Sequence, residues 1–439
     1  MHSPVIFSLG LATAFASLSA GHTVFTTLFV DDVNQGDGTC IRMSKKGDVS
    51  THPIAGGLDT PDMACGRDGQ EAVAFTLPAA AGSKLTLEFR MWADASQPGS
   101  IDPSHLGPIA VYLKPVSDMK TDEAAGPGWF KIWDEGYDAA AKKWATEKLI
   151  DNNGLLSLNL PSALPTGYYL ARHETITLQN VTNDKPDAQF YVGCAQLFIQ
   201  GTASSDSSPI PSDKQVSIPG HIQAGDPGLT HNVYKDDPIT YKLVGPPVFF
   251  PGSTSSTSTK PKPKPKSRAR RQPPAATTEQ TQGLIPPSCL VKNANWCGAA
   301  LPAYADEAGC WAAGEACFKQ LDDCYATAPP TGSKGCRVWE DEMCAAIQSA
   351  CRAGKFQGPP AGQGGQKLAG ADVVDEPVPG GKIPEAVNAG ESGSGSGNGG
   401  GGAAQTATAT ATAVDAPEAT KVSRCKNRRR REQRARKLD

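Results

Sequence analysis

The chain has 439 residues, of which 39% are hydrophobic, with 46 Gly and 36 Pro. A chain packed along its whole length would be closer to 45–50% apolar, so we expect one large core, a small module and much linker. The net charge of −3 hides two basic runs, with seven Lys/Arg at 260–271 and ten Lys/Arg against two acids at 421–439. The remainder carries 25 basic and 43 acidic residues. This acidic bulk argues against nucleic-acid binding.

Residues 1–21 have the pattern of a secretory signal, because 5–20 is an uncharged run of apolar and small residues too short for a membrane span. Gly21 and Ser19 are small at positions −1 and −3 of a cut that would make His22 the first mature residue. We therefore expect a secreted, extracellular protein without a membrane anchor. Outside the cell most of the twelve cysteines should form disulfides.

Short strand-like runs separated by turn signals such as 36–38, 152–154 and 165–167 fill residues 22–252. This pattern predicts a mainly β domain, a β-sandwich with long loops. Asn180-Val-Thr is an N-glycosylation sequon placed on a loop.

The rest of the chain divides by composition. Residues 253–283 form a Ser/Thr/Pro/Lys-rich linker, 284–354 a module with eight cysteines, 355–420 a Gly/Ala/Thr-rich segment expected to be disordered, and 421–439 a basic tail. Arg270-Arg271 is either a dibasic processing site or part of an exposed charge run, and the sequence leaves both open.

An N-terminal His22 would offer two nitrogen ligands, its α-amino group and an imidazole nitrogen. A second histidine would complete a planar three-nitrogen site of the kind that suits Cu(II). The candidates are His52, His105, His173, His221 and His231. Taken singly, each is more typical of a surface or hydrogen-bonded histidine than of a metal ligand.

An ordered set of motifs runs through most of 22–252: HTVFTTLFVDD at 22–32, TPDMAC at 60–65, SHLGPIAVYL at 104–113, FKIWDEG at 130–136, PTGYYLARHE at 165–174, QFYVGC at 189–194 and DPGLTHNVY at 226–234. In this order and spacing, the chain resembles the fungal copper-dependent lytic polysaccharide monooxygenases, the family formerly called glycoside hydrolase family sixty-one. The resemblance implies an immunoglobulin-like or fibronectin-like β-sandwich.

The resemblance also implies roles for particular residues. His22 and His105 would bind one copper ion, with the Tyr191 phenol in the axial position, and His173 and Gln189 would lie in the second sphere. Cys65 and Cys194 would form the disulfide of the sandwich, and Tyr234 would stack on sugar, although packing of its loop onto the core is equally compatible. Thr23 departs from the Gly that often follows the N-terminal histidine, and Cys40 is either free or paired with Cys425.

The implied activity is oxidative cleavage of β-1,4-glucan, most simply cellulose, with O2 or H2O2 and electrons from an external donor. We expect a monomer that binds neither nucleic acid nor membrane. Hydrolysis by paired carboxylates is the alternative chemistry, but no motif singles out a pair. A non-catalytic copper-binding or cell-wall adhesion protein on the same fold is the alternative function.

The eight cysteines of the module follow a helical spacing. Cys310, Cys317 and Cys324 are seven residues apart and share a helix face, and Cys336, Cys344 and Cys351 recur similarly. An antiparallel hairpin of two helices would pair Cys310 with Cys351, Cys317 with Cys344 and Cys324 with Cys336, and would leave Cys289–Cys297 as a local loop. Trp311, Phe318 and Tyr325 follow the same repeat, and they either form a sugar-stacking stripe or fill a small core, which is the more common arrangement.

Overall fold

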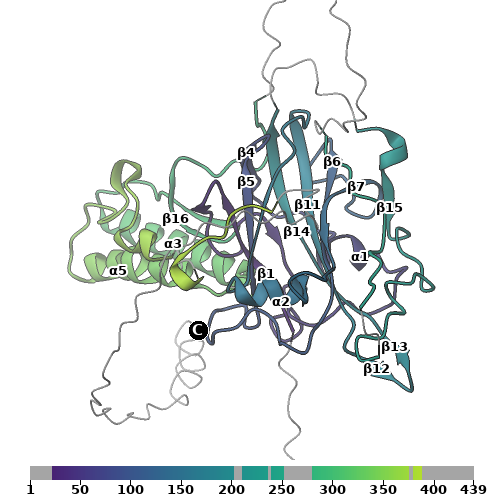
Figure 1. Ribbon diagram of the computed structural model, residues 1–439. Coiled ribbons are helices and arrows are strands. Elements are labelled where there is room, and N and C mark those ends of the chain that lie inside the picture. Colours follow the sequence, from purple (N-terminus) through teal and green to yellow (C-terminus); the bar gives the residue numbers. More distant parts are fainter. Residues whose placement is uncertain (1–21, 202–209, 236–238, 252–278, 375–378, 388–439) are drawn as a thin grey trace, which may run out of the picture. The chain divides into compact units, whose positions relative to one another are not determined.

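The computed structural model describes residues 22–201, 210–235, 239–251, 279–374 and 379–387 (Figure 1). The predicted signal segment 1–21, Arg270-Arg271, Cys425 and the basic tail 421–439 lie outside these ranges. The described residues all belong to one compact unit. Within the described part of the chain, no helix is both long and apolar enough to cross a membrane.

Two β-sheets form the larger domain. The first has the strand order β10-β5-β1-β2, and the second has the order β15-β7-β6-β11-β14-β3 with β4 added parallel to β14. The long strands β6, β7, β11 and β14 run side by side in Figure 1. The strands are β1 Val24–Val30, β2 Val33–Asn34, β3 Ile41–Arg42, β4 Leu77–Ala80, β5 Lys84–Arg90, β6 Ile109–Val116, β7 Gly126–Glu135, β10 Leu155–Asn159, β11 Gly167–Thr177, β14 Gln189–Gln200 and β15 Val216–Ile218.

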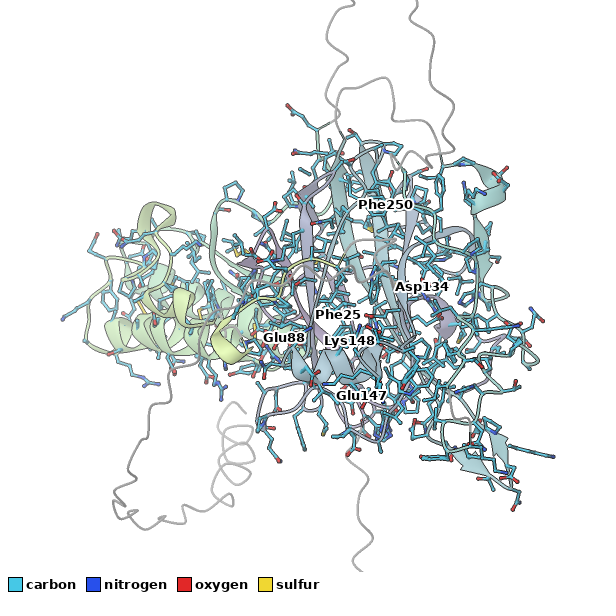
Figure 2. The ribbon with its side chains drawn as sticks, in the orientation of Figure 1. Phe25, Glu88, Asp134, Glu147, Lys148 and Phe250 are labelled. Atoms are coloured by element: carbon cyan, nitrogen blue, oxygen red, sulfur yellow. A yellow bond between two sulfur atoms is a disulfide. The ribbon has the colours of Figure 1, made fainter. Side chains whose placement is uncertain are left out.

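Alternating side chains of the two sheets meet in a core between them. Phe25 on β1, whose side chain is labelled in Figure 2, packs against Phe89 on β5 with ring centroids 5.9 Å apart. Leu87, Leu113 and Phe130 are buried in the same core. Burial of this apolar surface is the main force holding the sheets together. The predicted mainly β sandwich is confirmed.

Long loops cover the outer face of the second sheet and bury a second apolar cluster there. Trp129, Trp144, Tyr168 and Leu229 belong to this cluster. Two small hairpins, β8 Tyr137–Asp138 with β9 Lys143–Trp144 and β12 Val181–Thr182 with β13 Lys185–Pro186, lie in the connections. The short helices of the domain are α1 Asp62–Cys65, α2 Ala145–Asp151, which carries the labelled Glu147 and Lys148, and η1 Ser212–Lys214 (Figure 2). The loops therefore build an extensive surface on a rigid sheet frame.

The cysteine-rich module is a helical structure with one hairpin. Its elements are β16 Cys289–Asn293, β17 Trp296–Ala299, α3 Glu307–Thr327, α4 Lys334–Val338, η2 Trp339–Cys344 and α5 Ala345–Arg352. Asp306 starts α3 by accepting a hydrogen bond from the Gly309 amide at 2.7 Å. Trp339 is fully buried, and its indole N–H donates to the Cys317 carbonyl oxygen at 3.2 Å. A disulfide-rich helical region is thus present, as the sequence predicts.

Ten cysteines of the described residues form five disulfides. One, Cys65–Cys194, ties α1 to β14 in the sandwich. The other four lie in the module and are Cys289–Cys297, Cys310–Cys351, Cys317–Cys344 and Cys324–Cys336. The last three join antiparallel helices and match the index pairing of the sequence, whereas Cys289–Cys297 closes the local β16–β17 hairpin. Cys40 is a buried free thiol, and burial raises its pKa to about 12.

Two segments that composition marks as unstructured are ordered where the structure describes them. At the end of the predicted linker, the backbone amides of Thr281 and Gln282 both donate to the Tyr168 phenol oxygen at 2.8 Å. Beyond 354, inside the stretch expected to be disordered, Leu368 is buried and its amide donates to the Leu290 carbonyl at 3.0 Å. Three short 3-10 turns, η3 Gln363–Gly365, η4 Ala369–Val374 and η5 Pro379–Gly381, lie there. The expectation was wrong here because turns and loops can pack on a neighbouring surface without a core of their own.

Candidate active site

Three predicted ligand residues converge at one end of the sandwich. The ring centroids of His22 and His105 are 6.1 Å apart, those of His22 and Tyr191 are 6.2 Å apart, and those of His105 and Tyr191 are 6.1 Å apart. His22 lies two residues before the start of β1, His105 lies in the loop before β6, and Tyr191 lies on β14. Residues separated by up to 169 positions in the sequence therefore form one near-equilateral cluster of rings.

Local structure fixes each of these rings. The Thr23 hydroxyl donates to the Ser100 carbonyl at 2.7 Å and so anchors the chain just before β1. Thr23, which replaces the Gly that often follows the N-terminal histidine, therefore has a structural role. His105 precedes Gly107, and a Cβ atom at Gly107 would lie 1.9 Å from the Ile176 carbonyl oxygen. The turn that presents His105 therefore requires glycine at that position.

The two imidazoles favour their neutral forms. Burial, together with the nearby His52, His105 and Arg67, lowers the pKa of His22 below its ordinary value. Burial likewise lowers the pKa of His105, although Asp102 opposes this shift. Neutral imidazoles keep a lone pair available for a metal. The α-amino nitrogen of His22 becomes a third donor only when the peptide bond to Gly21 is cut.

The ring donors fit a copper ion. Two neutral imidazoles with a phenol alongside are the nitrogen-rich donor set that suits Cu(II). Among the described residues, no group of three His, Cys, Asp or Glu side chains could hold a metal ion by itself. A copper site here therefore depends on the amine of His22 and on the Tyr191 oxygen, neither of which belongs to that set of side chains.

His173, which the resemblance places in the second sphere, lies inside the sandwich. It is 1% exposed inside the sandwich, with its ring centroid 5.6 Å from that of Phe25 and 4.8 Å from that of Phe89. Burial lowers the pKa of His173 to about 3, so this imidazole is neutral throughout the working pH range. The ring passes Gly193, where a Cβ atom would meet its Nε2 at 3.0 Å. His173 is therefore an interior residue at the back of the site.

The residue that does contact Gln189 is Gln179. The Gln179 Nε2 donates to Gln189 Oε1 at 2.8 Å, and the Tyr191 hydroxyl donates to the same oxygen at 3.1 Å. Sequence reasoning missed Gln179 because an isolated glutamine after a strand carries no motif of its own. Its proximity follows from the β11–β14 register, in which Thr177 pairs with Gln189.

His52 also joins the cluster. Its ring centroid lies 4.5 Å from that of His22, the shortest such distance at the site. Arg67 holds the loop that carries it by donating to the carbonyl oxygens of Val49, His52 and Pro53. The sequence names His52 only as one of five candidate histidines, and its loop gives no further signal.

Tyr234 lies beside the site and is strongly exposed, with 64% of its surface accessible. Its hydroxyl donates to the Gln179 carbonyl oxygen at 3.0 Å, which fixes the ring near the site without burying it. Asn180, the sequon residue next to Gln179, donates to Asp187 Oδ2 at 3.0 Å. The exposed ring is the arrangement that sugar stacking requires, rather than packing onto the core.

The fold and the ring cluster define a β-sandwich protein with a nitrogen- and oxygen-donor site at its surface. Residues 22–241 match Auxiliary Activity family 9, formerly GH61. AA9 family lytic polysaccharide monooxygenase C of Aspergillus tamarii is 46% identical over 358 residues, covering 81% of this chain and 91% of the relative. AA9 family lytic polysaccharide monooxygenase H of Botryotinia fuckeliana (strain B05.10) is 46% identical over 356 residues, covering 81% of this chain and 78% of the relative. The chain belongs to Auxiliary Activity family 9, so it is a polysaccharide monooxygenase that cleaves its substrate oxidatively.

Among solved structures, CvAA9A is 36% identical and the match covers 52% of this chain and 98% of that chain, with a TM-score of 0.46. The similarity to the two curated relatives extends further along the sequence. Because 81% of 439 residues is about 355, an alignment of that extent reaches the cysteine-rich module even if it begins at Met1. The module is therefore part of what these relatives share with the chain.

Proposed function

We propose that the mature protein is a secreted enzyme that binds one copper ion through His22 and His105 and oxidises cellulose or a related β-1,4-glucan. The observation that carries the proposal is the convergence of the His22, His105 and Tyr191 rings within 6.1–6.2 Å of one another. The amine and imidazole of His22 and the imidazole of His105 would supply three nitrogens, and the Tyr191 phenol would add an oxygen donor. When bound, copper supplies the one-electron chemistry that activates O2 or H2O2 after reduction by an external donor.

The chain's own residues would orient the reacting groups. Because the Tyr191 hydroxyl gives its proton to Gln189 Oε1, its oxygen keeps a lone pair for the metal position. The Gln189 amide then keeps its N–H groups for a reactant at the site. His173, neutral and enclosed by Phe25 and Phe89, lines the inner side and excludes water from it. Tyr234 would stack on a sugar ring of the polymer.

Secretion and processing belong to the same proposal, because removal of residues 1–21 creates the amine of His22. The same proposal includes a monomeric protein in which a catalytic domain is followed by a small module. The sequon at Asn180 would carry a glycan next to the site. The alternative, a non-catalytic copper-binding or cell-wall adhesion protein on the same fold, requires no turnover, so an activity measurement separates the two.

The test uses the full secreted protein. Intact mass should show a chain that begins at His22. Copper-loaded protein incubated with cellulose and ascorbate should release oxidised oligosaccharides, whereas His105→Ala should bind copper weakly and release none. Absence of oxidised products from cellulose and from several other β-glucans would overturn the enzyme assignment for these substrates. Copper binding without products would favour the adhesion alternative.

A further inference from the structure

Two side-chain amides lie in series behind the Tyr191 phenol. Gln189 Oε1 accepts from Gln179 Nε2 at 2.8 Å and from the Tyr191 hydroxyl at 3.1 Å. A carboxamide oxygen has two lone pairs, so these two donors saturate it. The free end of Gln189 is consequently its NH2 group, and the phenol acts as a donor.

The same three side chains admit a reversed arrangement. If both amides turned by 180°, Gln189 Nε2 would donate to Gln179 Oε1 and to the Tyr191 oxygen. The phenol would then be an acceptor, with one lone pair occupied by an N–H group instead of facing the metal position. The orientation of Gln179 therefore decides which role Tyr191 plays.

The surroundings of Gln179 favour the observed orientation. Its backbone oxygen accepts from the Tyr234 hydroxyl at 3.0 Å, which holds the residue in place. Its Oε1 is buried and has no donor partner among the described residues. Reversal would put an NH2 group at that position, and a buried donor without an acceptor is rarer than a carbonyl oxygen without a donor.

We propose that Gln179 is a positioning residue for the oxidation reaction, which fixes the Gln189 amide so that Tyr191 donates its proton away from the copper position. This inference rests on the proposed function, because the phenol matters only if a metal binds beside it. It assigns a role to a side chain that touches neither the proposed ligands nor substrate.

The experiment compares Gln179→Glu and Gln179→Met in the full secreted chain loaded with Cu(II). A carboxylate at this position is isosteric with the amide but only accepts, so it should reverse Gln189 and alter the electron paramagnetic resonance spectrum of the copper. Turnover should fall about tenfold, as expected for loss of one oriented hydrogen bond. Lowering the pH toward about 4 should protonate the new carboxyl, restore a donor and return the spectrum toward wild type. The Met variant, which removes the contact without reversing it, should give a smaller change.

Gln366→Glu adds the same charge at an exposed residue of the segment after α5 and serves as the control. Thermal unfolding of each variant shows whether the fold is intact. If Gln179→Glu keeps the wild-type spectrum and turnover at pH 7, the inference is wrong while the proposed function stands. If wild-type protein itself gives neither a Cu(II) spectrum nor oxidised sugars, the proposed function is wrong, and the inference about Gln179 is wrong with it.

Discussion

Glu174 is the centre of a charged network buried beneath the active-site end of β11. It accepts from Arg172 at 2.6 Å and lies 3.0 Å from His221 Nε2, and the Tyr112 hydroxyl donates to it at 3.3 Å. Burial alone would raise the pKa of Glu174, but Arg172 and His221 outweigh it and hold the pKa well below its usual range. The carboxylate is therefore charged in the folded protein at every working pH.

Glu174→Gln should destabilise the protein strongly at neutral pH. Removing one partner of a buried pair leaves Arg172 uncompensated, which typically costs about 3–5 kcal/mol. Because the folded pKa is depressed, this stabilisation is complete above the unfolded value of about 4.3 and is lost as the pH falls through the lower folded value. Urea unfolding at pH 7, 5 and 3 should show a difference that shrinks only below about pH 4. A difference that grew with acid would contradict the assignment.

Tyr234 allows its ring and its hydroxyl to be tested separately. Tyr234→Ala removes the exposed ring and should weaken cellulose binding roughly fivefold, the effect of losing about 1 kcal/mol of apolar contact. Tyr234→Phe keeps the ring but removes the bond to the Gln179 carbonyl, so affinity should stay close to wild type while turnover falls slightly. Pull-down isotherms and initial rates distinguish these outcomes. Equal affinity of the Ala variant and wild type would exclude stacking by this ring.

At the scale of elements, the helix α3 presents two aromatic side chains to solvent and one to the module's core. Trp311 and Tyr325 are each 39% exposed, whereas Phe318 packs against the core cluster. The sequence left a sugar-stacking stripe and a core-filling role open. The structure packs Phe318 against the core and leaves the other two rings accessible, so a stacking role for them stays a prediction. The two exposed rings are fourteen residues apart, about 21 Å along a helix.

The double variant Trp311→Ala with Tyr325→Ala should therefore reduce retention on cellulose without changing the unfolding temperature. Phe318→Ala should instead lower the unfolding temperature and leave retention on cellulose unchanged, because truncation of a partly buried aromatic ring leaves a gap in the core. The measurements are a cellulose pull-down and a thermal melt of each full-length variant. Unchanged retention by the double variant would leave these rings without a binding role.

The elements also show which parts of the molecule could be predicted. The seven-residue repeat of the cysteines predicts the pairings of the module, because helical spacing puts them on one face and the short turn makes the helices antiparallel. Ordered motifs likewise locate His22, His105 and Tyr191. Gln179 and His52 could not be assigned, because their positions depend on strand register and on a loop held by Arg67. The order of 355–374 was missed because its partners lie elsewhere in the sequence.

At the scale of the whole molecule, the hairpin of the cysteine-rich module contacts the turn before β3. Asn295 donates from Nδ2 to the Gly38 carbonyl at 2.8 Å and accepts at Oδ1 from the Cys40 amide at 2.9 Å. A Cβ atom at Gly38, where φ is +69°, would lie 3.0 Å from the Ala294 Cβ atom. This close, two-point contact argues for a module held against the sandwich rather than tethered loosely.

Asn295→Ala should weaken this contact, which holds the Cys40 backbone amide, and so ease opening of the turn that carries the buried Cys40 thiol. The raised pKa of Cys40 and its burial make it unreactive at neutral pH, since the thiolate is the reacting form. The loss of two hydrogen bonds, each worth about 1 kcal/mol, should increase the population of molecules in which the module has come away from this turn. The rate at which a thiol reagent labels Cys40 should then rise about tenfold or more. Peptide mapping assigns the label to Cys40 and separates it from Cys425. Gln363→Ala, in η3, is the control, and labelling of the Asn295 variant at the wild-type rate would show that this contact does not hold the module in solution.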